Sequence, residues 1–318
     1  MSHTESMNTS KLTNTAELTN TTELKHAVVE FARGASTEIS PHDAGLLPTL
    51  AHKLPPGTTV YVAHTPKASL ADVVRVALQV QSLGLKASPH IVARRLESEN
   101  ALRAALRELR DGGVEQILLI AGDLDNPVRF TSTLEVIDTG ALVDSGIKRV
   151  GVAGHPEGHR HAGPAMLLSA LRHKQEFARK TGINVHIVTQ FGFRPDAICT
   201  WDRHLTDEGI TLPVHVGVAG PTPLPKLIKF AMQCGVGASM HSLMQNMSAM
   251  ANLARHATTP DEMFVGLVKG RAAGPGSRLV QPHLYAFGGT MATARWLRAV
   301  VDGTFELQPE GGKFIMDA

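Results

Sequence analysis

The chain has 318 residues, of which 43% are hydrophobic, and its 31 basic and 29 acidic residues leave a formal net charge of +2. This near balance, without a run of Lys and Arg, argues against nucleic acid or an anionic membrane as a main partner. No window approaches the roughly 18 to 20 apolar residues of a membrane helix, and the N-terminus lacks the order of a signal peptide. The two cysteines have no CxxC spacing, so we expect a cytoplasmic protein.

The composition divides the chain into three parts. Residues 1–24 are rich in Thr, Asn and Ser and carry too little apolar surface to offset the entropy of ordering, so we expect a flexible N-terminal arm. Residues 25–305 show no break in composition and are expected to form one catalytic domain. Residues 306–318 are expected to be a C-terminal tail.

Short apolar runs rich in β-branched residues alternate with longer segments of helical period, which is typical of repeated βα units. We count eight such runs, at residues 35–40, 58–64, 86–92, 114–123, 148–155, 184–191, 213–220 and 282–289. Helices are expected at residues 70–83, 98–111, 164–181, 224–233, 240–256 and 291–301. Eight strands in a domain of this length predict an α/β fold of the (β/α)8 TIM barrel type. A doubly wound open sheet is the alternative, but no GxGxxG follows an early strand.

Polar side chains stand at or near the carboxyl ends of six of these runs. They are Glu38, His64, His90, Asp123, His155 and Gln190. In a barrel these ends meet at one mouth, where ligands bind. The densest group is the segment 151–161, GVAGHPEGHRH, which begins within the fifth run and extends beyond its carboxyl end.

The histidines of this set could in principle bind zinc in a barrel hydrolase. The spacing does not favour this, because the first strand has no HxH and no helix has HExxH. Carboxylates on two strands beside imidazoles and an amide suit an organic cofactor with a proton donor next to it. We therefore expect no metal site.

Several of these segments, in the same order along the chain, resemble motifs of the methylenetetrahydrofolate reductase family. The segment 152–159 (VAGHPEGH) resembles the family's (A/G)xPExH, and residues 36–41 (STEISP) resemble its SFEFFPP. The remaining matches are 87–90 (ASPH) with APH, 121–123 (AGD) with RGD, 171–174 (LRHK) with LKxK and 188–191 (VTQF) with ITQFFF. The resemblance covers about residues 35 to 230. It implies a TIM barrel flavoprotein of one-carbon metabolism that uses FAD and NADH or NADPH.

The resemblance also implies a role for each matching residue. Glu38 would be the general acid that protonates N10 of 5,10-methylenetetrahydrofolate, opening the ring to an iminium that accepts hydride and gives 5-methyltetrahydrofolate. Asp123 would lie between flavin and pterin as a second catalytic residue, and Gln190, Asp123 and Phe191 would bind the folate. The residues implied to bind the cofactor are Thr65, His90, Gly122, Asp123, Ala153, His155, His159 and Lys174.

Three of these residues also have plainer interpretations. Glu38 beside apolar Ile39 should have a raised pKa if the mouth excludes water, but it could instead be a solvated glutamate paired with Arg33. Asp123 could be a turn or helix-capping residue. Lys174 could meet a pyrophosphate as a point charge, or could be an ordinary exposed helix lysine.

Some family positions differ here, and they lie where flavin and folate would bind. Ile39 and Ser40 replace two aromatics, Ala121 replaces the Arg of RGD, and His155 replaces a Tyr. Direct hydride transfer from a nicotinamide, without flavin, therefore stays open. So do a metal-dependent barrel hydrolase and a non-catalytic folate or flavin carrier. We expect a homo-oligomer, and a Met-rich segment at 240–250 could be its interface or a core helix.

Overall fold

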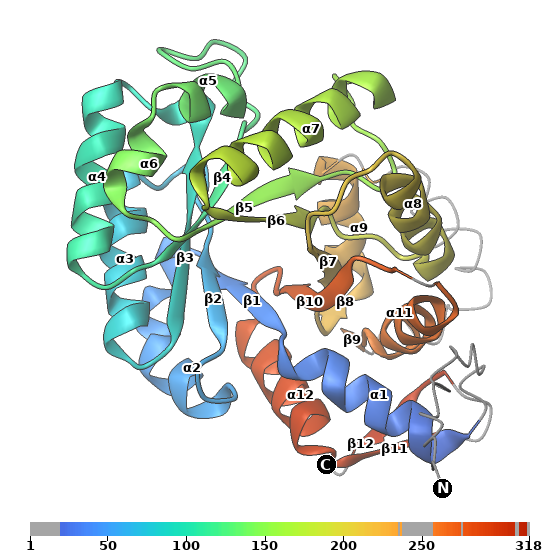
Figure 1. The fold of residues 1–318 in the computed structure, drawn as a ribbon. Coiled ribbons are helices and arrows are strands. Elements are labelled where there is room, and N and C mark those ends of the chain that lie inside the picture. The colour runs from blue at the N-terminus through green and yellow to red at the C-terminus, as the bar shows by residue number, and fades with distance from the viewer. Residues whose placement is uncertain (1–19, 235, 237–256, 275, 309–311, 317–318) are drawn as a thin grey trace, which may run out of the picture.

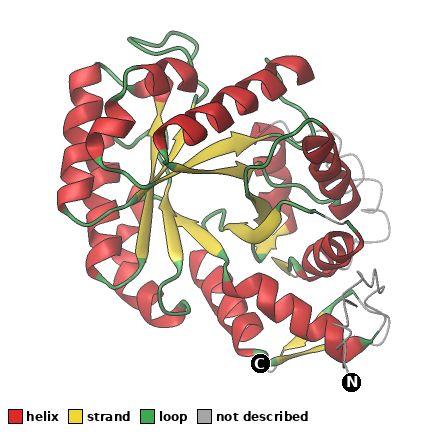
Figure 2. Cartoon of the chain, in the orientation of Figure 1, coloured by secondary structure: helices red, strands yellow, loops and turns green. Residues whose placement is uncertain are grey.

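A computed structural model describes residues 20–234, 236, 257–274, 276–308 and 312–316. Within these residues eight parallel strands close into a barrel surrounded by helices (Figures 1 and 2), in the order β1-β10-β7-β6-β5-β4-β3-β2. The strands are β1 (Ser36–Ile39), β2 (Thr59–Val62), β3 (Lys86–Val92), β4 (Gln116–Ile120), β5 (Arg149–Gly154), β6 (Asn184–Thr189), β7 (Val214–Ala219) and β10 (Leu279–Tyr285). Each lies in or overlaps one of the eight predicted runs, so the (β/α)8 barrel is confirmed.

Helices connect the strands and cover the outside of the barrel. They are α1 (Thr21–Arg33), α2 (Leu47–Lys53), α3 (Leu70–Ser82), α4 (Glu99–Asp111), α5 (Thr133–Asp138), α6 (Ala141–Ser145), α7 (Pro164–Thr181), α8 (Pro195–Asp207), α9 (Leu224–Cys234), α11 (Asp261–Ala273) and α12 (Thr290–Asp302), with 3-10 turns η1 (Pro41–Leu46) and η2 (Ala93–Arg95). The predictions for α3, α4, α7, α9 and α12 are confirmed to within two residues at either end. The expected helix at 240–256 lies outside the described residues.

The local sequence explains where the helices begin and end. In α3 the Ser69 hydroxyl accepts a bond from the Asp72 amide and the Asp72 carboxylate accepts one from the Ser69 amide, which forms a capping box. Helix α7 starts with a proline at its first position and stops at Gly182, whose φ of +75° favours glycine. The predicted stop after α7 is therefore confirmed.

The core lies between the barrel and its helices. Alternate strand residues such as Val60, Ile91 and Val152 point outward and are fully buried against apolar helix faces. The opposite residues point into the barrel, where Tyr61, Leu118 and Val188 form a small cluster of their own. The inward side chains toward the carboxyl ends of the strands form the mouth that the sequence predicted.

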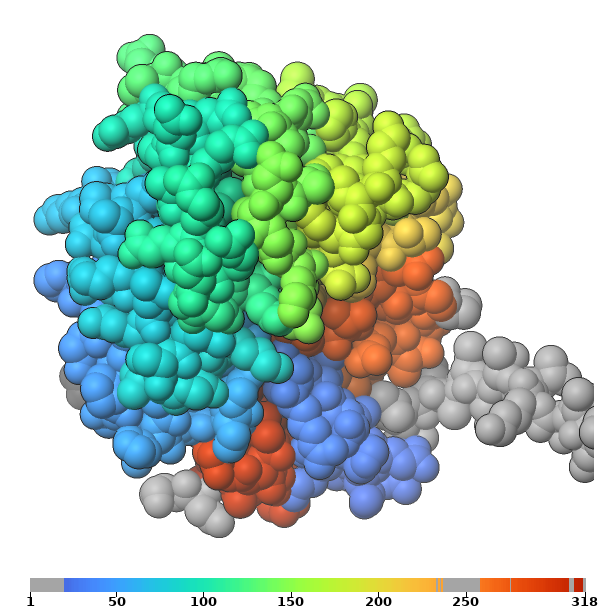
Figure 3. Space-filling model, turned by 60° about the vertical axis from the view of Figure 1, so that its left-hand side comes forward, coloured from blue at the N-terminus to red at the C-terminus, as the bar shows by residue number. Residues whose placement is uncertain are grey.

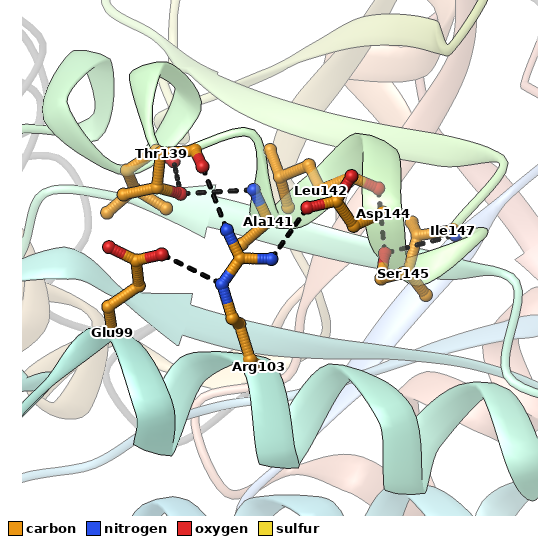
Figure 4. A network of polar contacts seen from close by, with 9 residues as sticks. Glu99, Arg103, Thr139, Ala141, Leu142, Asp144, Ser145 and Ile147 are labelled. Atoms are coloured by element: carbon orange, nitrogen blue, oxygen red, sulfur yellow. Dashed lines mark hydrogen bonds and ion pairs between the residues drawn. The ribbon is translucent and has the colours of Figure 1, made fainter.

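A polar network around Arg103 anchors the segment after β4 (Figure 4). The Arg103 guanidinium, on α4, donates to Glu99, to the backbone carbonyl of Thr139 and to Asp144, at 2.8, 2.9 and 2.7 Å. Thr139 ends α5, and Asp144 lies on α6. One side chain therefore holds two short helices against α4. Helices of this length are not stable by themselves.

Both ends of the described chain differ from the expected boundaries. Helix α1 begins at Thr21 and buries Leu24, so the boundary at residue 24 falls inside a helix. The expected tail forms a hairpin, β11 (Phe305–Leu307) with β12 (Phe314–Met316), in which Phe314 stacks on Trp296 of α12. The N-terminal and C-terminal segments pack side by side (Figure 3). A separate two-stranded antiparallel sheet pairs β8 (Thr222–Pro223) with β9 (Ala257–Thr258).

Candidate active site

Glu38 lies near the carboxyl end of β1 and points into the barrel mouth. It pairs in register with Tyr61 of β2, and its carboxylate accepts a hydrogen bond from the backbone of Ala286, beyond β10. Desolvation outweighs that bond and raises the pKa of Glu38 to about 7. Arg33, the alternative partner, is paired with Glu30 on its own helix. Glu38 is therefore a carboxyl group poised to hold or release a proton near neutral pH.

The loop after β10 carries backbone strain beside Glu38. Phe287 has a φ of +46°, and it is the non-glycine residue with positive φ among those described. Gly288 and Gly289 follow, and a Cβ on Gly288 would lie 2.7 Å from Lys226 Nζ. Strain of this kind concentrates at functional sites, where the surrounding structure holds it in place. This loop is the part of the mouth that the sequence interpretation missed.

A second group surrounds Arg95, which follows β3. Its guanidinium donates to the Thr65 carbonyl at 2.7 Å and lies 3.5 Å from the Asp123 carboxylate. The Asp123 side chain is 85% exposed. Gly122 beside it has a φ of +86°, and a Cβ there would lie 2.3 Å from Val92. The loop after β4 can therefore approach β3 only with glycine at position 122.

His90 and His64 lie near each other at this edge of the mouth. Desolvation, with the charge of His64, lowers the pKa of His90 to about 3. Desolvation and the charge of Arg95 also lower the pKa of His64. Both imidazoles are therefore neutral at pH 7. His64 Nδ1 and His90 Nε2 are buried and have no hydrogen-bond partner among the described residues.

The third group follows β5. The rings of His155 and His159 meet edge to face at 4.8 Å, and the partly buried Ala153 lies on the strand before them. Lys174 of α7 is 6% exposed, and desolvation lowers its pKa to about 8. Its charge acts on His155, whose pKa is lowered to about 4 mainly by burial. The alternative interpretation of Lys174 as an exposed helix lysine is wrong.

Gln190 and Phe191 follow β6. The Gln190 amide oxygen accepts a bond from the Phe191 backbone at 3.1 Å. Phe191 is 1% exposed, so its ring packs against other side chains of the mouth. It lies 4.9 Å from Phe287, which stacks on Phe230 at 4.6 Å. Two aromatic positions of the family are replaced by Ile39 and Ser40, but these rings and Tyr285, from different elements, form an aromatic cluster.

The groups share one mouth. Desolvation and then the charges of Glu38 and Asp123 raise the pKa of the Cys234 thiol, at the end of α9, so both carboxylates act on one atom. Desolvation, followed by the charge of Glu38, also raises the pKa of Tyr285. Glu38 of β1 and Asp123 of the loop after β4 therefore both lie close enough to the end of α9 to affect the same thiol.

Comparison with known families agrees with this arrangement. A model of the family "Methylenetetrahydrofolate reductase" matches residues 58–258, which is more than half of the chain. The chain belongs to the methylenetetrahydrofolate reductase family. The match includes the predicted site residues from Thr65 to Phe191, and it begins after Glu38, whose assignment rests on the resemblance at residues 36–41 and on the geometry above.

Two solved structures, both from Burkholderia cenocepacia J2315, also resemble the chain. One is a proposed lyase/mutase with 13% identity, a TM-score of 0.47 and 88% coverage of each chain. The other is a proposed phosphonomutase with 12% identity, a TM-score of 0.48 and coverage of 88% of this chain and 99% of that one.

Two further features bear on what this reductase-family mouth can hold. The buried nitrogens His64 Nδ1 and His90 Nε2 have no hydrogen-bond partner among the described residues, and the N–H and O–H groups of a flavin's ring and ribityl chain would suit them. The ammonium of Lys174 is buried, and the phosphate oxygens of the same cofactor would suit it as acceptors. Among the same residues, no three His, Cys, Asp or Glu side chains are grouped as a metal ion would require. The described helices include none long and apolar enough to cross a membrane.

Proposed function

We propose that the protein interconverts 5,10-methylenetetrahydrofolate and 5-methyltetrahydrofolate by hydride transfer from NADH or NADPH, with FAD as cofactor. Family membership supports a reductase of this general type. The observation that carries the proposal is Glu38, a carboxyl group with a pKa of about 7 at the mouth of the barrel.

Glu38 is suited to the proton transfer that opens the folate ring. With a pKa near 7, about half of the molecules hold the proton at neutral pH, and the acid is still strong enough to give it up. The Ala286 backbone bond favours the carboxylate that remains after the proton leaves. Proton donation to N10 and recovery of the proton in the reverse direction therefore need no other acid.

Other residues of the mouth would bind the two larger ligands. His90, His155, His159 and Lys174, with the backbone at Thr65, Gly122 and Ala153, would hold FAD, and Lys174 would meet its pyrophosphate as a desolvated cation. When bound, FAD supplies the ability to take hydride from a nicotinamide and to pass it to the folate. Asp123 and Gln190 would bind the polar pterin edge, and the exposed parts of Phe230 and Tyr285 would line its path.

Replacing Glu38 by Gln tests the acid. The variant keeps the shape and loses the proton, so we expect reduction of methylenetetrahydrofolate to fall by about 10²- to 10⁴-fold. Nicotinamide-driven reduction of bound flavin, followed anaerobically by absorbance, should not change. Glu30→Gln, an exposed glutamate on α1, is the matched control. Equal loss of both half-reactions would reject Glu38 as the proton donor.

The colour of the purified wild-type protein and its turnover separate the alternative functions. A yellow protein that reduces methylenetetrahydrofolate supports FAD as cofactor. A colourless protein with the same turnover would replace FAD by direct transfer from the nicotinamide. A protein that binds flavin or folate without turnover would be a carrier.

A further inference from the structure

A cavity of about 820 Å³ opens at the amino-terminal end of the barrel, opposite the Glu38 mouth. The first residues of the strands line it, together with the C-terminal turns of α1 and α7. Its volume lies in the range of small-molecule sites. The proposed function uses none of its residues.

The wall of this cavity is cationic. Arg33, Lys86, Arg149 and Arg179 line it, and no Asp or Glu is among the lining residues. Arg33 and Arg179 stand in the last turns of their helices, where cations complement the helix dipole, and each pairs with a glutamate of its own helix. Two of the four cations therefore have a structural explanation.

Lys86 and Arg149 have no such explanation. Each begins a barrel strand, and neither side chain forms an ion pair or hydrogen bond among the described residues. The carboxylate nearest in effect to Lys86 and Arg149 is that of Glu115, which forms its hydrogen bond and ion pair with Lys148. These contacts lower the pKa of Glu115 most, and the charges of Arg149 and Lys86 lower it further. One carboxylate thus faces three cations, and a positive excess stays at the rim.

The inner end of the cavity presents uncharged hydrogen-bonding groups. The rings of His186 and His215 stack at 4.1 Å, and burial lowers the pKa of both, so they are neutral at pH 7. His215 Nδ1 is buried and has no hydrogen-bond partner in the described part of the chain. Gln116 donates to the Tyr61 hydroxyl at 3.2 Å, and that hydroxyl lies 3.1 Å from His186 Nε2. This layer closes the cavity toward the barrel centre.

We propose that this cavity binds a small metabolite bearing a phosphate or carboxylate group. Lys86 and Arg149 meet the oxyanion at the rim, and His215 Nδ1 offers a hydrogen bond to a polar group that reaches the inner end. Phosphate and carboxylate share the geometry that a guanidinium recognises, so one site serves either.

The test uses the full chain with two probes, pyrophosphate and citrate, titrated by calorimetry with sodium chloride holding the ionic strength constant. We expect saturable binding of at least one probe, and its identity tells phosphate from carboxylate recognition. Lys86→Gln and Arg149→Gln should each weaken that binding at least about tenfold, the usual effect of losing one charge-assisted contact. Both residues are exposed, so both variants should fold.

Two controls locate the site. Arg107→Gln removes an exposed cation of α4 that does not line the cavity, and it should leave binding unchanged. Lys174→Met alters the proposed FAD site, and it should leave the binding that depends on Lys86 and Arg149 unchanged. Absence of binding, loss of binding in Lys174→Met only, or equal weakening in Arg107→Gln would each overturn the proposal. None of these outcomes bears on folate reduction, which Glu38→Gln tests separately.

Discussion

Glu38 shows how a single side chain acquires a function from its surroundings. As a strand residue of a barrel it would be ionised in water, but the mouth withdraws it from solvent and raises its pKa to about 7. A hydrogen bond from the Ala286 backbone partly opposes that effect. The balance between the two decides whether the group is an acid or a spectator at physiological pH.

The pH dependence of folate reduction follows from this balance. The proton donor is the acid form, and its population falls as pH rises through about 7, so kcat/KM for methylenetetrahydrofolate should drop about tenfold per unit above that pH. Below pH 7 Glu38 is mostly protonated, so its titration should no longer change kcat/KM. Initial rates across the range check the profile. A wild-type rate independent of pH on the alkaline side would contradict the assignment.

Lys174 is the second residue whose state is set by burial. An ammonium group that is 6% exposed and has a pKa of about 8 is destabilised where it stands. Such a group is retained at a cost in stability, which is typical of a residue that awaits an anionic ligand.

Lys174→Met should therefore have opposite effects on stability and on binding. Removing the desolvated charge should raise the unfolding free energy of the ligand-free protein, by at most about 3 kcal/mol. The dissociation constant for FAD should increase at the same time. Urea denaturation and flavin titration measure the two. Lys180→Met, an exposed change on the same helix, is the control, and a stability loss confined to Lys174→Met would refute the prediction.

At the scale of elements, the segment between β4 and β5 carries Asp123 at its start and needs support at its far end. Helices α5 and α6 are too short to persist alone, and Arg103 of α4 holds both. The carbonyl of Thr139 and the carboxylate of Asp144 meet one planar guanidinium, a geometry that lysine cannot reproduce.

Arg103→Met should lower the urea midpoint of unfolding, because it leaves a partly buried carbonyl and an exposed carboxylate without their donor. Arg107→Met is the matched control, since Arg107 lies on the exposed face of the same helix. Urea midpoints of both variants give the comparison. Equal effects would show that the network contributes nothing beyond helix propensity.

At the scale of the whole molecule, the barrel interior is rich in neutral histidines. Burial lowers the pKa of His90 and His283 to about 3, that of His186 to about 4, and that of His215 well below its usual value. Tyr61 contacts His90, His186 and His283 and joins these rings across the barrel. The fold therefore depends on these groups staying uncharged.

Stability should fall as the solution becomes acidic. The unfolded chain binds protons at these histidines below about pH 6.5 and the folded chain does not, so each can cost up to about 2 kcal/mol by pH 5. Urea denaturation at several pH values between 7 and 5 tests this. His283→Gln should make the loss of stability shallower, whereas His26→Gln, which changes an exposed residue of α1, should keep the wild-type slope. Stability independent of pH over this interval would contradict the prediction.

Sequence reasoning was most successful where the signal is local. The apolar runs and the segments of helical period between them predicted the eight strands and several helices, because strand and helix formation depend on neighbouring residues. The polar residues at the strand ends were identified from their position at the carboxyl ends of these runs. Helices α1, α8 and α11 and the hairpin at 305–316 were missed, since their faces are defined by what they pack against, as Phe314 is by Trp296.

The sequence by itself determined the barrel and which polar residues stand at its mouth. Tertiary structure decided what those residues can do. The Ala286 backbone reaches Glu38 from the other end of the chain, Lys174 is desolvated by the fold around it, and the cationic cavity gathers the beginnings of separate strands. Proton affinity and ligand recognition depend on solvent exclusion and on charges distant in sequence, and only the folded chain brings these together.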